Sequence, residues 1–143
     1  MAGRGLSLVV FSGGFDRVHY ALAMAAAALA TGAPVSLLFT GRALPALVES
    51  GEAERPGWHA LDAADDGSAP AVRDGVLAGR GVAGFEELLT ACAALGATVI
   101  VCEMGLRALG LPAGVRLRAD IPHRVGGIVT FLGAAGAGGI LFV

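Results

Sequence analysis

The sequence contains no lysine, and charged residues make up only 15% of its 143 residues. Its ten basic residues are all arginine and face twelve acidic ones, which gives a formal net charge of −2. A protein that binds nucleic acid does so largely by neutralising phosphates with a basic face. This balance of charge supplies no such face, so we expect no nucleic-acid partner.

Cysteine and histidine are also scarce, with two and three residues respectively. Two cysteines cannot form a disulfide framework, and the histidines are too scattered to give the spacing of a zinc site. We expect no signal peptide, because Met1-Ala2-Gly3-Arg4 leads directly into a predicted strand. We therefore expect a cytoplasmic protein with free thiols, and we predict neither a metal nor a cofactor.

Apolar residues are abundant: 55% of the chain is hydrophobic and the mean hydropathy is +0.72. Two windows, 21–41 and 125–143, carry no charge and approach the roughly 20 residues that span a bilayer. Glycine and proline interrupt the first window, and the second is rich in glycine. We interpret both as buried elements of an α/β domain and expect no membrane-spanning segment.

Hydrophobic runs and turn signals predict the order of elements along the chain. Buried strands are predicted at 6–11, 35–39, 98–102 and 140–143. Helices are predicted at 16–31, with Asp16 as the cap, and at 43–48, 85–95, 104–109 and 126–137; residues 115–118 form either a strand or an extended link. Strands that alternate with helices indicate βαβ units, a mostly parallel sheet and right-handed crossovers. We predict a single domain over residues 1–143, with the first and third strands adjacent.

Residues 49–84 have a different composition, with acidic residues, glycine, proline and little periodicity. We predict a long loop or a partly helical insertion here. Segments of this length are typical of lids, interfaces or mobile regions.

The two cysteines have different sequence surroundings. Cys92 lies on the apolar face of the predicted helix 85–95, which predicts a core residue packed against Leu88 and Leu95. Cys102 ends a buried strand and precedes a helix, where open α/β sheets bind ligands. Backbone N–H groups and the helix dipole stabilise a thiolate at such a place, and Arg107 could add positive charge. The alternative is that Cys102 is merely the last buried residue of its strand.

Two further features could belong to the same site. Ser12, Gly13 and Gly14 form a glycine turn between a strand and a helix, which can hold an anion or simply line the crevice that contains Cys102. His19, about one turn into that helix, could exchange protons with the thiol or be a structural histidine. The spacing of the glycines matches no complete nucleotide-binding fingerprint.

The stretch VIVCEMGLRALGL at residues 99–111 resembles the cysteine motif of the DsrE/DsrF-like family, in which a strand ends in Cys followed by x-Met-Ser-Met-Asp-x-Met-Gly. Three further stretches, VVFSGGFDRVHYALAMAAAALATGAPVSLLFTGRAL, GFEELLTACAALGATVIVC and VGGIVTFLGAAGAGGILFV, resemble other elements of the family in order and spacing. The resemblance covers nearly the whole chain apart from about residues 49–80. The chain differs from the motif at Gly105 in place of Ser, at Arg107 in place of Asp, and at Leu106 and Leu109 in place of Met.

The resemblance implies a flavodoxin-like, three-layer α/β/α fold that assembles as a homotrimer or larger homo-oligomer. It also implies a sulfurtransferase-like role in sulfur relay, in which Cys102 carries persulfide sulfur between donor and acceptor proteins. The small number of charges likewise favours an oligomer, because a monomer of this size would expose apolar patches. Two alternatives remain open from the residues: a non-catalytic module that binds a small molecule or nucleotide, and a structural oligomer subunit with an incidental thiol.

Overall fold

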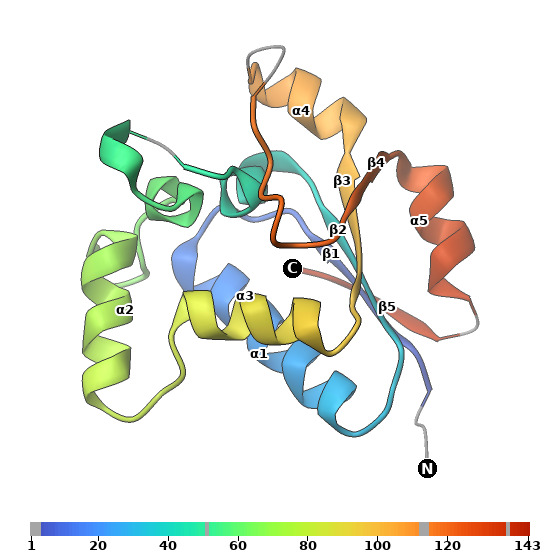
Figure 1. Cartoon of the computed structure of the whole chain (residues 1–143), viewed down its shortest axis with the longest axis horizontal. Helices are drawn as coiled ribbons and strands as arrows, with labels where there is room; N and C mark the ends of the chain where they lie inside the picture. Colours follow the sequence, from blue (N-terminus) through green and yellow to red (C-terminus); the bar gives the residue numbers. More distant parts are fainter. Residues whose placement is uncertain (1–3, 51, 112–114, 137) are drawn as a thin grey trace.

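The computed structural model describes residues 4–50, 52–111, 115–136 and 138–143 of the chain (Figure 1). Within these residues the strands are β1 (Leu6–Val10), β2 (Val35–Phe39), β3 (Thr98–Cys102), β4 (Arg124–Gly126) and β5 (Gly139–Phe142). The α-helices are α1 (Phe15–Ala30), α2 (Pro70–Gly79), α3 (Phe85–Ala94), α4 (Glu103–Leu109) and α5 (Ile128–Ala135). Short 3-10 helices cover Gly41–Leu47, Glu52–Glu54 and Gly57–Ala60.

All the strands pair in parallel in one sheet, in the order β4-β3-β2-β1-β5. The crossovers from β1 to β2 and from β2 to β3 proceed in the same direction across the sheet. The helices α1 and α3 pack against each other on one face of the sheet. The step from β4 to β5 runs back across the sheet, and α5 lies on the opposite face (Figure 1). Right-handed crossovers that reverse direction place their helices on opposite faces. The chain therefore has the predicted flavodoxin-like α/β/α architecture in a single domain.

The predicted adjacency of the first and third strands is wrong, because β2 lies between β1 and β3. Adjacent first and third strands require the chain to reverse direction after β2, as in the flavodoxin strand order. Here α1 and α3 share one face, so the sheet grows in one direction through β4 and reverses only before β5. The hydrophobic patterns of β1, β2, β3 and β5 predicted these strands, but such a pattern does not encode the neighbours of a strand.

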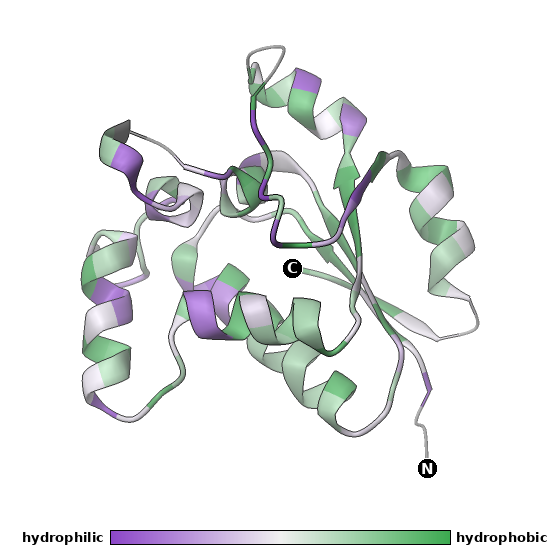
Figure 2. Ribbon diagram, in the orientation of Figure 1, coloured by the Kyte–Doolittle hydropathy of each residue, from purple (hydrophilic) through white to green (hydrophobic). Residues whose placement is uncertain are grey.

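The two faces of the sheet are covered unequally. The larger core packs the sheet against α1, α3 and the 3-10 helix Gly41–Leu47. A smaller cluster lies on the other face and consists of Leu38, Ile100, Cys102 and Phe131. On this second face α5 packs mainly on β2, β3 and β4 and carries no strongly hydrophilic residue (Figure 2). The part of the face formed by β1 and β5 is left with exposed apolar side chains, among them Phe142.

The segment 49–84 is partly helical, as predicted, because it contains α2 and two 3-10 helices. Trp58 anchors it by stacking on Phe85 with ring centroids 4.9 Å apart, and Phe15 completes this aromatic cluster. The backbone of Asp62 exchanges hydrogen bonds with the turn before α1. The segment is therefore packed against the body of the domain at these points.

Several boundaries differ from the predictions. The helix α1 is capped by Gly14 instead of Asp16, whose carboxylate accepts a hydrogen bond from the backbone N–H of Asp65 at 2.7 Å. Residues 115–118 are the extended link, in which Leu117 forms an isolated antiparallel bridge with Val48. The strand β4 was missed because it has only three residues and includes an exposed arginine. The predicted end of the last helix, Ala137, lies outside the described residues.

Candidate functional site

Cys102 lies at the carboxyl end of β3 and is the N-cap residue of α4. Its Sγ accepts a hydrogen bond from the backbone N–H of Gly105 at 3.4 Å. The side chain is only 1% exposed and belongs to the small cluster beneath α5, on the face of the sheet opposite α1. The predicted strand-to-helix position of the thiol is thus confirmed, with its sulfur directed to the less covered face.

An apolar pocket of about 310 Å³ opens beside Cys102. Side chains of the first three strands form one side of it, and α5 contributes Ile128, Phe131 and Leu132. The residues that line it are Val9, Phe11, Leu38, Thr40, Cys102, Met104, Ile128, Phe131, Leu132, Ile140 and Phe142. None of these described residues is charged, and cysteine is the strongest nucleophile among them.

The first turn of α4 approaches the end of β2 closely at Gly105. A Cβ atom built on Gly105 would lie 2.6 Å from Thr40 Oγ1 and 3.2 Å from the backbone nitrogen of Gly41. The absence of a side chain at position 105 thus allows α4 to pack here and its N–H to reach the sulfur of Cys102. This close approach gives a physical reason for glycine where the DsrE/DsrF-like motif has serine.

The structure does not bring Arg107 or His19 to the thiol. The side chain of Arg107 is 79% exposed, and its guanidinium pairs with Glu103 at 2.6 Å, outside the apolar pocket. His19 is buried, and its Nε2 donates a hydrogen bond to the carbonyl oxygen of Ala83 at 2.9 Å. Its ring packs on Phe15, in the core on the opposite face of the sheet from Cys102. The structure therefore supports the structural interpretation of His19 and assigns Arg107 to a surface ion pair.

The glycine turn does not share a pocket with Cys102 either. Ser12 and Gly13 line a separate pocket with the ion pair of Arg42 and Asp62. The predicted common crevice is wrong for two reasons. The strand β2 separates β1 from β3, and the turn leads into α1 on one face while the sulfur of Cys102 lies on the other.

Several donors of this turn are already used within the protein. The N–H of Gly14 donates to Ser12 Oγ at 3.2 Å, and the N–H of Phe15 donates to the carbonyl oxygen of Asp62 at 3.2 Å. A Cβ atom on Gly13 would lie 2.5 Å from the carboxylate of Asp62. Because an anion would meet this carboxylate and find those donors engaged, the geometry favours a tight structural turn over an anion site.

Cys92 occupies the core position predicted for it. It is 1% exposed in the larger core, and its Sγ lies 3.5 Å from the carbonyl oxygen of Leu22, to which the thiol donates. Burial raises the pKa of the Cys92 thiol to about 11. Its predicted neighbour Leu88 packs against this core, whereas Leu95 is half exposed at the end of α3. The buried face of α3 is therefore narrower than the sequence predicted. The protonated, buried thiol of Cys92 agrees with a packing role.

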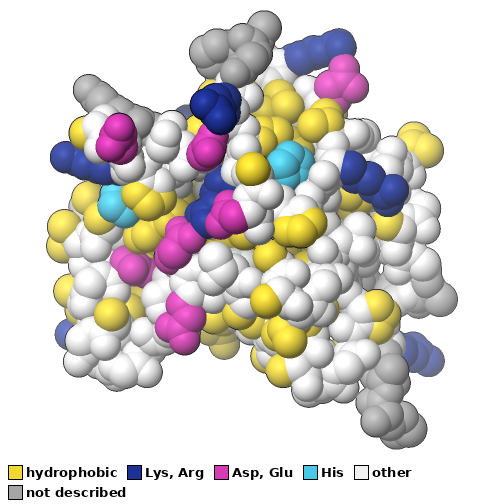
Figure 3. All heavy atoms as spheres, viewed as in Figure 1, with side chains coloured by type: hydrophobic (Ala, Val, Ile, Leu, Met, Phe, Trp, Pro, Cys, Tyr) yellow, Lys and Arg dark blue, Asp and Glu magenta, His cyan; other side chains and the backbone are white. Residues whose placement is uncertain are grey.

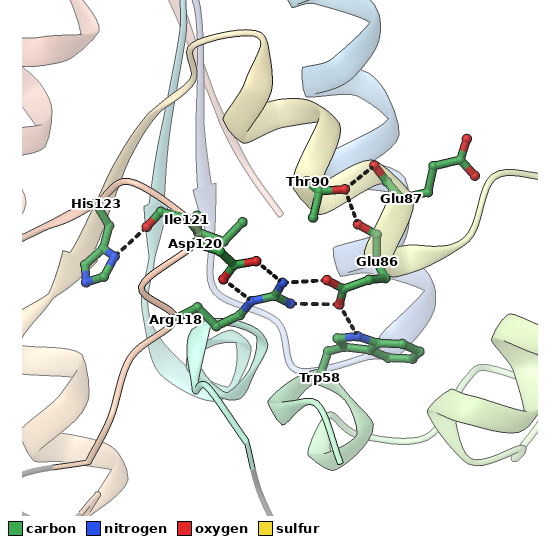
Figure 4. A network of polar contacts seen from close by, with 8 residues as sticks. All are labelled: Trp58, Glu86, Glu87, Thr90, Arg118, Asp120, Ile121 and His123. Carbon is green, nitrogen blue, oxygen red and sulfur yellow. Dashed lines mark hydrogen bonds and ion pairs between the residues drawn. The ribbon is translucent and has the colours of Figure 1, made fainter. Parts of the chain in front are cut away.

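A charged network that sequence reasoning missed lies on the α1 and α3 side of the sheet. Arg118, whose side chain is 8% exposed, binds Glu86 through two hydrogen bonds and also pairs with Asp120 (Figure 4). Trp58 Nε1 donates to Glu86 at 3.1 Å. These bonds hold the pKa of both carboxyls below their usual range. The network joins α3, the extended link and the segment 49–84, which indicates a structural role.

Acidic and basic side chains gather around this region on the face of the molecule seen in Figure 3, with hydrophobic side chains between them. The pocket beside the network has a volume of about 200 Å³. Its lining combines Arg118 with the carboxylates of Glu49, Glu54, Glu86 and Asp120. Since the arginine is already saturated by two of those carboxylates, the network offers no free cation to a ligand.

No protein-family model and no curated protein matches the sequence. Among the residues that the structure describes, no helix is both long and apolar enough to cross a membrane. The same residues contain no cluster of three or more His, Cys, Asp or Glu side chains that could hold a metal ion.

The sequence located the thiol but not the pocket beside it. The residues Val9 and Leu38 were assigned to predicted strands, yet the face to which they point could not be assigned without the strand order. One available signal was the helix at the end of the chain, IVTFLGAA, which has no polar side for solvent. A helix that is apolar all round indicates further covering or a pocket at its surface.

Proposed function

We propose that the protein is a sulfur-relay protein of the DsrE/DsrF-like type that carries persulfide sulfur on Cys102. The observation that carries this proposal is the position of the buried Cys102 sulfur in the wall of an apolar pocket at the carboxyl end of β3, where it accepts a hydrogen bond from the Gly105 N–H. Transfer of sulfur between thiols needs a cysteine nucleophile and an approach route. The pocket supplies the approach, and the hydrogen bond holds the sulfur in place.

The proposal includes a cytoplasmic location and assembly into a homotrimer or larger homo-oligomer. A reducing compartment would keep both cysteines as the free thiols seen in the structure. The exposed apolar side chains of α5 and β5 support assembly, because contiguous apolar patches on soluble proteins mark interaction sites. The proteins that donate sulfur to Cys102 and accept it from Cys102 would then bind to this oligomer.

The test is sulfur loading followed by mass spectrometry of the intact protein. Wild type, Cys102→Ser and the matched control Cys92→Ala are each incubated with benzyl persulfide and, separately, with glutathione persulfide. We expect wild type and Cys92→Ala to gain the mass of one sulfur atom from at least one donor. Cys102→Ser should gain none, and its circular dichroism should remain that of wild type because only one atom changes.

Loading that persists in Cys102→Ser, or no loading of wild type by either donor, would overturn the relay proposal. The alternative function is then a non-catalytic module that binds a small molecule in the same pocket. The specific observation in its favour is the volume of about 310 Å³, which lies at the lower end of the range for ligand pockets.

A further inference from the structure

The lining of the Cys102 pocket restricts what can enter it. Of the side chains that line it, only Thr40 and Cys102 carry a polar group. Arginine, histidine, aspartate and glutamate are all absent from this lining. A pocket with one nearly continuous apolar wall and two polar groups binds a ligand that is itself mostly apolar.

Charged sulfur donors fit this pocket poorly. Moving a carboxylate or a sulfur oxyanion from water into an apolar site is costly unless a cation or several hydrogen bonds replace the water. Arg107, which follows Cys102 closely in the sequence, is held by Glu103 at the surface. Among the described residues no arginine lines the pocket, so no positive charge compensates an anionic donor there.

The dimensions of the site favour a small molecule. Cys102 is only 1% exposed, so a reacting atom must enter the pocket to reach its sulfur. The aromatic rings of Phe11 and Phe142, with centroids 5.3 Å apart, belong to the lining and are themselves half exposed or more. They can therefore contact both the ligand and solvent, as residues at the mouth of a pocket do.

We infer that the pocket binds an apolar organic persulfide, R–S–SH, with its hydrocarbon group against α5 and its sulfur atoms at Cys102. This inference rests on the proposed function and names the class of its sulfur donor. The deprotonated sulfur of Cys102 attacks the outer sulfur of the donor, and a new S–S bond forms while the S–S bond of the donor breaks. The electron pair leaves on R–S⁻, which takes up the proton released by Cys102. The products are Cys102–S–SH and R–SH, with no external oxidant or reductant.

The experiment compares the initial rates at which benzyl persulfide and the anionic glutathione persulfide load Cys102, corrected for the rates at which each loads a small free thiol. We expect the apolar donor to be at least tenfold faster with wild type. Leu132→Glu, which places a carboxylate in the apolar lining, should slow loading by benzyl persulfide at least fivefold. Leu132→Arg should instead accelerate glutathione persulfide.

Leu95 provides the matched control, because it is a leucine of nearly equal exposure, 50% against 53% for Leu132, at the end of α3 on the other side of the sheet. Leu95→Glu and Leu95→Arg should therefore retain the wild-type preference. Ligand-observed NMR of the unreactive analogue benzyl methyl sulfide with Cys102→Ser measures binding to the pocket in the absence of sulfur transfer. The molar mass of each variant is checked by light scattering.

The outcomes separate the two proposals. Equal corrected rates for both donors would overturn the apolar-donor inference and leave the relay function standing. Binding of benzyl methyl sulfide, weakened by Leu132→Glu, without sulfur loading from either donor would overturn the relay function and show an apolar binding site. Absence of both binding and loading would overturn both proposals.

Discussion

At position 105 the first turn of α4 passes so close to Thr40 that a side chain has no room. The nearest atom to a new Cβ is Thr40 Oγ1, which can rotate away, but the backbone nitrogen of Gly41 at 3.2 Å cannot. We therefore predict that Gly105→Ser lowers the free energy of unfolding by about 1–3 kcal/mol, the usual cost of overpacking. Chemical denaturation measures this change.

The control for this prediction is Gly75→Ser within α2, where a Cβ meets no atom within 4 Å. It should be neutral or slightly stabilising, because glycine is a poor helix former. Combining Gly105→Ser with Thr40→Ala should recover part of the loss. If Gly105→Ser is as stable as wild type, α4 can move away from β2, and the close approach does not require glycine at position 105.

At the scale of elements, α3 is joined to the extended link by the bonds between Glu86 and Arg118. Breaking a buried ion pair costs about 3–5 kcal/mol, but Glu86 is nearly half exposed and Asp120 still pairs with the arginine. We predict that Glu86→Gln lowers the free energy of unfolding by about 1–2 kcal/mol near neutral pH. Glu103→Gln, in the exposed pair with Arg107, should change it by less than about 0.5 kcal/mol.

The effect of Glu86 should depend on pH in a defined direction. Hydrogen bonds from Arg118 lower the pKa of Glu86 from its ordinary value of 4.5 in the folded state. The folded state thus favours the charged form, and this stabilisation is present above pH 4.5 and lost as the pH falls through the lowered pKa. The difference between wild type and Glu86→Gln should shrink below pH 4.5. A difference that is constant from pH 3 to pH 7 would contradict the assigned ion pair.

The elements also show what the sequence could and could not predict. The strands β2 and β3 were predicted residue by residue, because each is a run of five residues, mostly apolar, that is bounded by turns or followed by a helix. The strand β4 gave no such signal, since two of its three residues are exposed. Strand order and the face occupied by each side chain depend on crossover directions, which local patterns do not encode. The thiol of Cys102 was therefore located correctly, whereas its partners were not.

At the scale of the whole molecule, the two faces of the sheet differ in how completely they are covered. Helices and 3-10 segments enclose the face with α1, while α5 alone packs on the other face among the described residues. The edge strand β5 and the outer side of α5 remain apolar and exposed. Edge strands of this kind are commonly protected by charges, proline or a covering element. The described residues of β5 and α5 provide neither charge nor proline, and in the proposed assembly another subunit would cover them.

The last prediction concerns that assembly. Val129 on α5 is 85% exposed and does not line the Cys102 pocket, so Val129→Glu should disrupt subunit contacts without altering the pocket directly. Val72 on α2 is a matched valine that is 60% exposed. Multi-angle light scattering at micromolar concentration should give wild type and Val72→Glu a mass of at least three 14.2 kDa chains, and Val129→Glu a smaller one. A monomeric wild type would contradict the proposed assembly. Dissociation in Val72→Glu but not in Val129→Glu would show that the subunit contact involves α2 instead of α5. Because one buried charge in each subunit repeats in every copy of a symmetric contact, a single substitution is enough to decide between the two helices.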